Sequence, residues 1–442
     1  MEEQKAIPEK HRQLKPKLGL WDAVAINVGA IIGGGIFIAT GIIAGLAGSA
    51  LIISMVLASI IALFTALTFA ELTAWKPVEG AVYEYSRLLI SPSVGFLTGW
   101  MWMIANTFGG SAVSLGFGHY LGAIFPELPG NIVACIICLC FTGLNLIGVK
   151  QSAIVNNIFV VLKLAVLGFF VVFGLFFVNM SNFLPFEPFN EGMFYGIGLI
   201  FFAFGGFPRI AIIAEEVKDP KRNVPRAVLI SLLITAVVYT VVGAVAIGLT
   251  GPQNLAASNA PLVAAIGATG NMMAAQILAI GGSLAMASVL LAAVLGVSRM
   301  AFSMARNHDM PKILSKVHHK FDTPYIAILT VGIIMSIVVL FADLAGTIVV
   351  STFGLVFTYI CANIAALRLK KQKRMYPKII PTIGLITSIL IMIFVFFATP
   401  TAWLTGVIFL IIGAILALIR KHQSKTKKTK NKNPTHQNLK NP

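Results

Sequence analysis

Charged residues are scarce in this sequence. Asp and Glu number only 16 among its 442 residues, and all charged residues together make up 11%, against about 25% in an ordinary soluble domain. Hydrophobic residues make up 57%, and the mean hydropathy is +0.89. A chain with so little charge cannot cover its own surface in water. This excludes a water-soluble fold and predicts that lipid is the solvent.

Cysteine is also rare, and groupings typical of metal sites are missing. The four cysteines, Cys135, Cys138, Cys140 and Cys361, lie inside apolar runs, and no His, Asp or Glu accompanies the Cys-x-x-Cys spacing in its segment. We therefore expect free thiols, no metal and no cofactor. We expect no secretory signal sequence either, because the first 18 residues are polar and the apolar segment after them is long enough to be a retained helix.

Long apolar blocks are what the sequence does contain. Each is long enough to cross the ~30 Å hydrocarbon layer at ~1.5 Å per residue, which predicts an all-α membrane protein. The blocks between charged or Pro/Gly-rich segments predict twelve transmembrane helices, near 20–45, 50–74, 94–121, 130–148, 154–178, 193–214, 226–249, 275–302, 325–342, 345–367, 377–398 and 402–420.

The distribution of basic residues predicts the orientation of these spans. If the amino terminus lies inside, all but Lys163 and Arg209 of the 33 Lys and Arg residues fall on the inner side. The outer loops carry Glu127, Glu187, Glu191 and Asp343 and no basic residue. Because basic residues accumulate in cytoplasmic loops, both termini are expected there. Topology and attraction to anionic lipid account for the net charge of +17, and nucleic-acid binding is disfavoured.

Two spans are interrupted midway. The first contains "VGAIIGGGIF" and the sixth contains "FFAFGGFPRI". Glycine weakens a helix by about 1 kcal/mol per residue, and proline removes a hydrogen-bond donor. Non-helical backbone at this depth is tolerated only against protein or a water-filled cavity. Breaks at matching places in oppositely directed spans predict an inverted repeat with a solute site at the midplane. Close packing of small residues is the alternative interpretation.

The free backbone groups at such breaks suit a zwitterion. N–H groups around Gly33, Gly34, Gly35 and Ile36 can hold a carboxylate. Carbonyl groups near Ile31 and Phe204 can hold an ammonium group, because each helix end carries about half an elementary charge. An α-amino acid presents both groups close together.

Three segments resemble the amino acid-polyamine-organocation (APC) superfamily of transporters: "VGAIIGGGIF", "FFAFGGFPRIAIIAEEVKDPKRNVPRAV" and "GVSRMAFSMARNHDMPKIL". The resemblance covers about residues 15–420. It implies a LeuT-like fold of five-plus-five inverted repeats and alternating access to a midplane amino-acid site. The expected division is a cytoplasmic segment 1–18, a first repeat 19–178, a second repeat 193–368, two further helices within 376–420, and a basic, disordered cytoplasmic tail 421–442.

The resemblance also implies site residues. The positions that match the family's backbone-binding residues are Ile31, Gly33, Gly34, Gly35, Phe204, Gly205 and Phe207, and Phe202 matches an aromatic lid. Ile104 and Gly109 are expected to line the side-chain pocket from the third span. Where certain cationic-substrate antiporters carry an acid, this chain has Pro208 followed by Arg209, which disfavours an arginine or polyamine substrate. Apolar residues around Ile104, Phe207 and Phe353 suggest a small or apolar one.

Lys163 is a cation within an apolar span, and such residues are functional candidates by default. It resembles a lysine on the fifth helix of proton-coupled APC members that takes the place of a sodium ion in their relatives. We therefore predict that Lys163 couples transport to protons, with Ser288 facing the same pocket. A purely structural lysine that extends to the inner surface is the alternative.

Each of the other ionisable residues has two possible roles. Arg209 either points at an anionic group or satisfies carbonyls freed by the second break. Glu71 is expected at the inner end of the second span, in a gate network or a structural ion pair with arginines such as Arg222 or Arg226. Glu215 and Glu216 close the sixth span, as gating or folding elements. His119 is expected to cap the third span rather than carry protons.

The leading hypothesis is a plasma-membrane transporter that carries amino acids together with protons. An exchanger without net proton movement is the main alternative, and a receptor that binds without transporting is a remote one. A membrane enzyme is disfavoured because no catalytic grouping is present, and a channel because no helix has a repeated polar stripe. The oligomeric state is left open.

Overall fold

The computed structural model describes residues 18–77, 80–147, 149–208, 217–321 and 323–432. Within these ranges the regular elements are helices, together with one isolated parallel bridge between Leu18 and Val217. An all-α membrane protein is thereby confirmed. Among the described residues, eight helical stretches are long and apolar enough to cross a membrane: Leu20–Trp75, Gly130–Ile147, Ile158–Leu175, Pro220–Ala256, Met272–Arg306, Leu344–Leu367, Ile379–Ala398 and Pro400–Arg420.

The first part of the chain contains the elements up to Phe204. They are α1 (Leu20–Ile31), η1 (Gly35–Ala39), α2 (Thr40–Ala47), η2 (Gly48–Ala50), α3 (Leu51–Trp75), α4 (Ala81–Leu89), α5 (Pro92–Gly122), α6 (Gly130–Ile147), α7 (Val149–Leu175), η3 (Met180–Phe183), α8 (Glu191–Ile200) and η4 (Phe201–Phe204).

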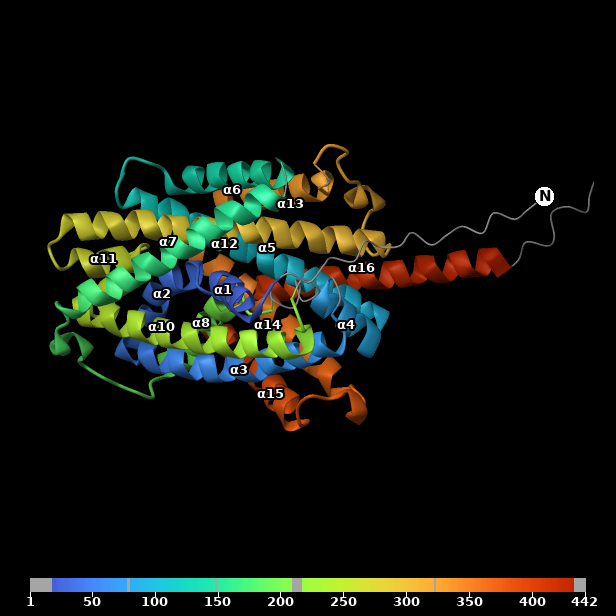
Figure 1. Ribbon diagram of the computed structural model, residues 1–442, viewed down its shortest axis with the longest axis horizontal. Helices are drawn as coiled ribbons and strands as arrows, with labels where there is room; N and C mark the ends of the chain where they lie inside the picture. The colour runs from blue at the N-terminus through green and yellow to red at the C-terminus, as the bar shows by residue number, and fades with distance from the viewer. Residues whose placement is uncertain (1–17, 78–79, 148, 209–216, 322, 433–442) are drawn as a thin grey trace, which may run out of the picture.

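The remaining helices follow residue 217. They are α10 (Pro220–Ala256), α11 (Pro261–Gly267), α12 (Met272–Arg306), η6 (Lys312–Ser315), α13 (Tyr325–Phe341), α14 (Leu344–Leu367), η7 (Lys371–Lys373), α15 (Ile379–Ala398) and α16 (Pro400–Lys432). The helix α16 extends well beyond the rest of the bundle (Figure 1).

Polar residues mark where several of these helices begin. The side chains of Asn190, Asn271 and Asp343 accept hydrogen bonds from backbone N–H groups in the first turns of α8, α12 and α14, over 2.7–3.0 Å. A capping oxygen satisfies one of the free donors at a helix start and stabilises it by about 1 kcal/mol. These caps therefore fix the ends of helices that are otherwise almost wholly apolar.

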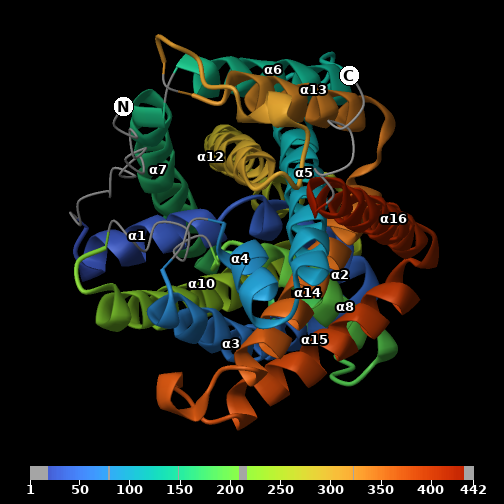
Figure 2. The same cartoon turned by 90° about the vertical axis from the view of Figure 1, so that its right-hand side faces the viewer.

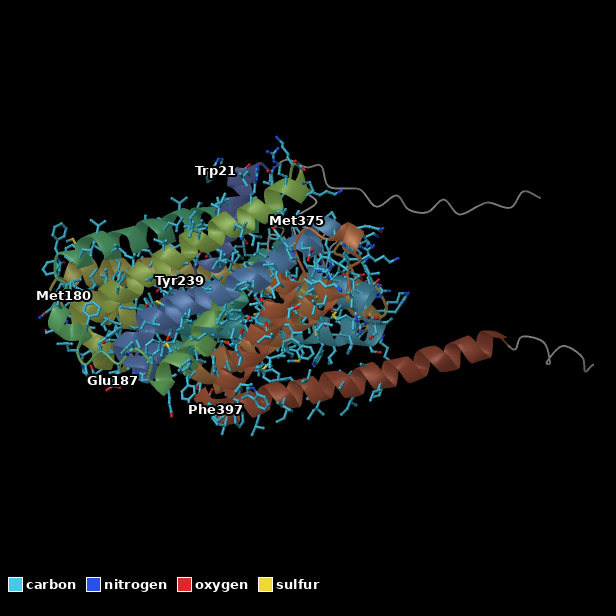
Figure 3. All side chains as sticks on the ribbon, turned by 90° about the horizontal axis from the view of Figure 1, so that it is seen from below. Trp21, Met180, Glu187, Tyr239, Met375 and Phe397 are labelled. Carbon is cyan, nitrogen blue, oxygen red and sulfur yellow. The ribbon has the colours of Figure 1, made fainter. Side chains whose placement is uncertain are left out.

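The long helix α5 lies inside the bundle. It packs against both α12 and α14. The view along the bundle places α6 and α13 on one flank, and α3 and α15 on the opposite flank (Figure 2). Met180 and Glu187 lie towards one end of the molecule and Met375 towards the other, with Tyr239 between them (Figure 3).

Candidate functional site

The first predicted break is present. The helix α1 ends at Ile31, and Ile32 leaves it with extended backbone angles (φ −71°, ψ 104°). A helix resumes at Gly34 and continues through the π-helical turn Gly35–Ala39 into α2. Carbonyl groups at the end of one helical piece and N–H groups at the start of the next are therefore left without helical partners.

The second break follows α8. The chain tightens into a 3-10 turn over Phe201–Phe204 and then into turns through Pro208. Gly205 N–H donates to the Phe202 carbonyl (3.1 Å), so the turn is closed by short-range bonds rather than by an α-helix. Arg209, Glu215 and Glu216 lie outside the described residues.

The two breaks meet backbone to backbone. A methyl group on Gly35 would overlap the backbone of Ala203, and one on Gly206 would overlap the Ala30 carbonyl and the Cα of Ile31. Only glycine allows such an approach. The glycines of the two breaks therefore have two roles: they interrupt the helices, and they allow the two backbones to touch.

Tyr239 of α10 joins both breaks. Its hydroxyl oxygen lies 2.9 Å from the Ile31 carbonyl oxygen and 3.0 Å from the Ala203 carbonyl oxygen, so one proton is shared between the two. The side chain is fully buried. Its ring also packs against Phe204, with 5.1 Å between centroids.

A cavity of about 50 Å³ lies where the breaks meet. Its walls come from the two breaks and from α5, α12 and α14. The lining residues are Ala30, Ile31, Gly33, Gly34, Gly35, Ala105, Asn106, Gly109, Gly110, Val113, Phe202, Ala203, Gly205, Gly206, Val289, Ala293, Ser351 and Leu355. Every one of these described residues is uncharged.

Six of the nine expected binding residues line this cavity: Ile31, Gly33, Gly34, Gly35, Phe202 and Gly205. Phe204 and Phe207 do not, because they are packed in the core, Phe204 against Tyr239 and Phe207 against Phe69 and Tyr359. In a 3-10 turn residues three apart share a face, so Phe202 and Gly205 face the cavity together. Ile104 is also absent from the lining, whereas its neighbour Ala105 is part of it.

Sequence reasoning missed three polar groups at this site. Asn106 and Ser351 line the cavity, and Tyr239 bridges the breaks. The Asn106 amide donates to the Trp102 carbonyl (2.9 Å), and the Ser351 hydroxyl donates to the Ala105 carbonyl (2.7 Å). Each belongs to a short polar pair within an apolar span, with a threonine directly after it, which is the signal that could have identified it.

A second cavity, of about 10 Å³, shares Asn106 and Gly205 with the first. Its other walls come from α3, α4, α12, Pro208 and Trp102 of α5. Asn106 therefore lies between two neighbouring cavities.

Lys163 and Ser288, expected to face one pocket, are in contact. The Lys163 Nζ donates to the Gly29 carbonyl (2.5 Å) and to the Ser288 hydroxyl (3.0 Å). Lys163 is fully buried. The ammonium group thus links α7 to α1, just before the first break, and to α12.

Glu71 has different partners from those expected. It is 1% exposed, and its Oε1 accepts hydrogen bonds from the backbone N–H groups of Met375 and Tyr376 (2.8 and 3.1 Å). In the described part of the chain it forms no ion pair with Arg222 or Arg226. Glu71 fastens the end of α3 to the loop before α15.

A cluster around Asp309 lies just beyond α12, outside the membrane-spanning segments. Its carboxylate accepts a hydrogen bond from the Tyr83 hydroxyl (2.8 Å) and pairs with Arg420 of α16. Burial raises the pKa of Asp309 above its usual value, although Tyr83 and Arg420 oppose that shift. Three segments distant in sequence are thereby joined at one charged group.

Known proteins resemble this chain over most of its length. A family model described as amino acid permease matches residues 18–430. The relatives include an uncharacterized transporter of Mycobacterium tuberculosis, 35% identical over 86% of each chain. A branched-chain amino acid permease of Bacillus subtilis is 31% identical over 94% of this chain and 96% of its own. A methylthioribose transporter of the same organism is 29% identical over 93% and 95%. This chain therefore belongs to the amino acid permease family, within the APC superfamily of membrane transporters.

Proposed function

We propose that this protein carries an α-amino acid across the plasma membrane by alternating access, with the substrate's backbone bound between the two breaks. The observation that carries the proposal is the convergence of residues from both breaks, Ile31 and Gly33–Gly35 from the first and Phe202–Gly206 from the second apart from Phe204, on one cavity. Backbone N–H and carbonyl groups that the interrupted helices do not use lie beside this cavity, and such groups attract opposite charges.

Each end of the zwitterion has its own partners in this proposal. The carboxylate binds N–H groups of Gly33, Gly34, Gly35 and Ile36, where helix resumes after the first break. The ammonium group binds carbonyls near Ile31 and Phe204. The Ile31 carbonyl already accepts from Tyr239, but a carbonyl oxygen has two lone pairs and can accept a second proton.

The proposed architecture is twelve spans in a LeuT-like five-plus-five inverted repeat, with two further helices and both termini cytoplasmic. The apolar helices Glu191–Phe204 and Tyr325–Phe341, shorter than the eight long stretches, support the larger count. The one-sided distribution of basic residues supports the orientation. A fluorescent protein fused to the carboxyl terminus should fluoresce, and alkaline phosphatase fused there should be inactive. The reverse result would refute the orientation.

We further propose that substrate and proton enter together. Lys163 supports this because its ammonium group joins Gly29, beside the first break, to Ser288 on α12. Loss of a proton would weaken both contacts, so proton binding and the arrangement of α1 would depend on one another.

Uptake into proteoliposomes tests the function. A thermal-shift screen of the purified protein against the common amino acids and polyamines first identifies a ligand, since a ligand stabilises by RT ln(1 + [L]/Kd). A pH gradient, acid outside, should then drive accumulation of that ligand. Exchange without response to the gradient would favour the amino acid or amine exchanger. Binding without counterflow would favour a receptor.

A further inference from the structure

Resting on the proposed function, we infer that the substrate is an α-amino acid with a small, neutral side chain: glycine, alanine, serine or threonine. The proposal places the substrate's charged backbone at the two breaks. Its side chain must then occupy the part of the cavity bounded by α5, α12 and α14.

That part of the cavity is narrow. Gly109 of α5 faces Phe202 and Ser351: a methyl group on Gly109 would lie 2.8 Å from the Ser351 oxygen and 3.4 Å from the Phe202 ring. The adjacent Gly110 lies against Ala293 and Met335. Because a methyl group added to Gly109 would already meet both α14 and the second break, a leucine or aromatic side chain cannot be placed beside it without displacing them.

The walls are also uncharged throughout the described lining. A lysine, arginine, aspartate or glutamate side chain would leave water there without a counter-charge, which is strongly unfavourable. The cavity therefore selects against both signs of side-chain charge.

Two polar groups remain available within this wall. The Ser351 hydroxyl donates its proton to the Ala105 carbonyl, so its oxygen can accept a hydrogen bond. The Asn106 amide nitrogen donates to the Trp102 carbonyl, and its carbonyl oxygen accepts none from the described residues. A serine or threonine hydroxyl can donate a hydrogen bond to either oxygen, while glycine and alanine have no side-chain group that needs a hydrogen-bond partner.

Dissociation constants for the purified full-length protein test this inference, measured from the concentration dependence of thermal stabilisation. Glycine, alanine, serine and threonine should bind at least about tenfold more tightly than leucine, phenylalanine, lysine or glutamate. If leucine or lysine binds as tightly as alanine, the inference falls while the proposed function stands. If no amino acid binds, both fall.

Two variants test the residues that carry the argument. Gly109→Ala should weaken threonine binding about tenfold more than glycine binding, because the added methyl group takes the space of the larger side chain. Gly168→Ala is the matched control, since its methyl group would meet nothing within 4 Å. Ser351→Ala should weaken serine and threonine relative to alanine. Unchanged ratios in both Gly109→Ala and Ser351→Ala would overturn the inference.

Discussion

Gly35 and Gly206 are the residues on which contact between the two breaks depends. Each faces backbone rather than the end of a flexible side chain, so the neighbour cannot move aside easily. We predict that Gly35→Ala or Gly206→Ala destabilises the protein by about 1–3 kcal/mol and abolishes uptake. Melting temperature and proteoliposome uptake measure the two effects.

Gly168→Ala provides the control for these glycines as well. It makes the same chemical change inside a helix with open space around the new methyl group, and it should leave uptake unchanged. Full uptake by the Gly35 and Gly206 variants would show that the breaks do not need to touch.

Lys163 is the second residue with a specific expectation. Replacing it with alanine removes the donor to Gly29 and Ser288. We predict that Lys163→Ala abolishes accumulation driven by a pH gradient but retains some exchange of substrate. Ser288→Ala keeps the lysine and should reduce gradient-driven uptake less. Accumulation by Lys163→Ala at the normal level would refute proton coupling through this residue.

At the scale of elements, α10 holds the two breaks together through Tyr239. Tyr239→Phe keeps the ring but leaves the Ile31 and Ala203 carbonyls without their shared donor. We predict a loss of about 0.5–2 kcal/mol in stability, with a larger fall in uptake than in folded protein. Tyr195→Phe is the control, because that hydroxyl is exposed and contacts only Glu191 among described residues. Equal uptake by both variants would contradict a positioning role for Tyr239.

The helix breaks could be predicted from sequence because their cause is local. Three consecutive glycines, or a Gly-Gly pair followed by proline, weaken a helix wherever they occur. Contacts across the bundle could not be predicted in the same way. The hydrogen bond from Lys163 to the Gly29 carbonyl depends on how α7 crosses α1. The packing of Phe204 and Phe207 in the core, away from the cavity, depends on the 3-10 turn at Phe201–Phe204 and the turns after it, which no sequence spacing predicts.

At the scale of the whole molecule, the Asp309 cluster joins α4, the end of α12 and α16. Removing Arg420 leaves the nearly buried Asp309 carboxylate without its counter-charge. We predict that Arg420→Ala destabilises the protein at neutral pH by about 1–3 kcal/mol. Arg87→Ala, which breaks the more exposed pair with Glu84, should cost about 0–1 kcal/mol.

The pH dependence follows from the raised pKa of Asp309. At pH values between the usual pKa of an aspartate, about 4, and the raised pKa of Asp309, the folded protein holds a proton on this carboxyl group that the unfolded chain releases. Stability from this group is therefore present at low pH and is lost as pH rises through that window. Melting temperatures across the window should show this slope in the native protein and lack it in Asp309→Asn. The Arg420→Ala defect should shrink at acid pH, and an unchanged defect would contradict the assignment.

The overall class and the positions of most helices were predictable because hydrophobic length is encoded residue by residue. The partners of Glu71 were not: an acid at the end of α3 was expected to bind arginine, but it binds the backbone N–H groups of Met375 and Tyr376. Backbone N–H groups are present in every loop, so the sequence does not indicate which of them will bind a buried carboxylate. The same applies to Asn106 and Ser351, whose role depends on which spans converge.

The depth of Lys163 has an electrical consequence. A neutral amino acid that travels with one proton moves one net positive charge per cycle, and Lys163 would hold that charge inside the membrane's voltage drop. Each elementary charge gains about 2.3 kcal/mol per 100 mV, so an interior-negative potential would draw substrate inward even when both sides are at equal pH.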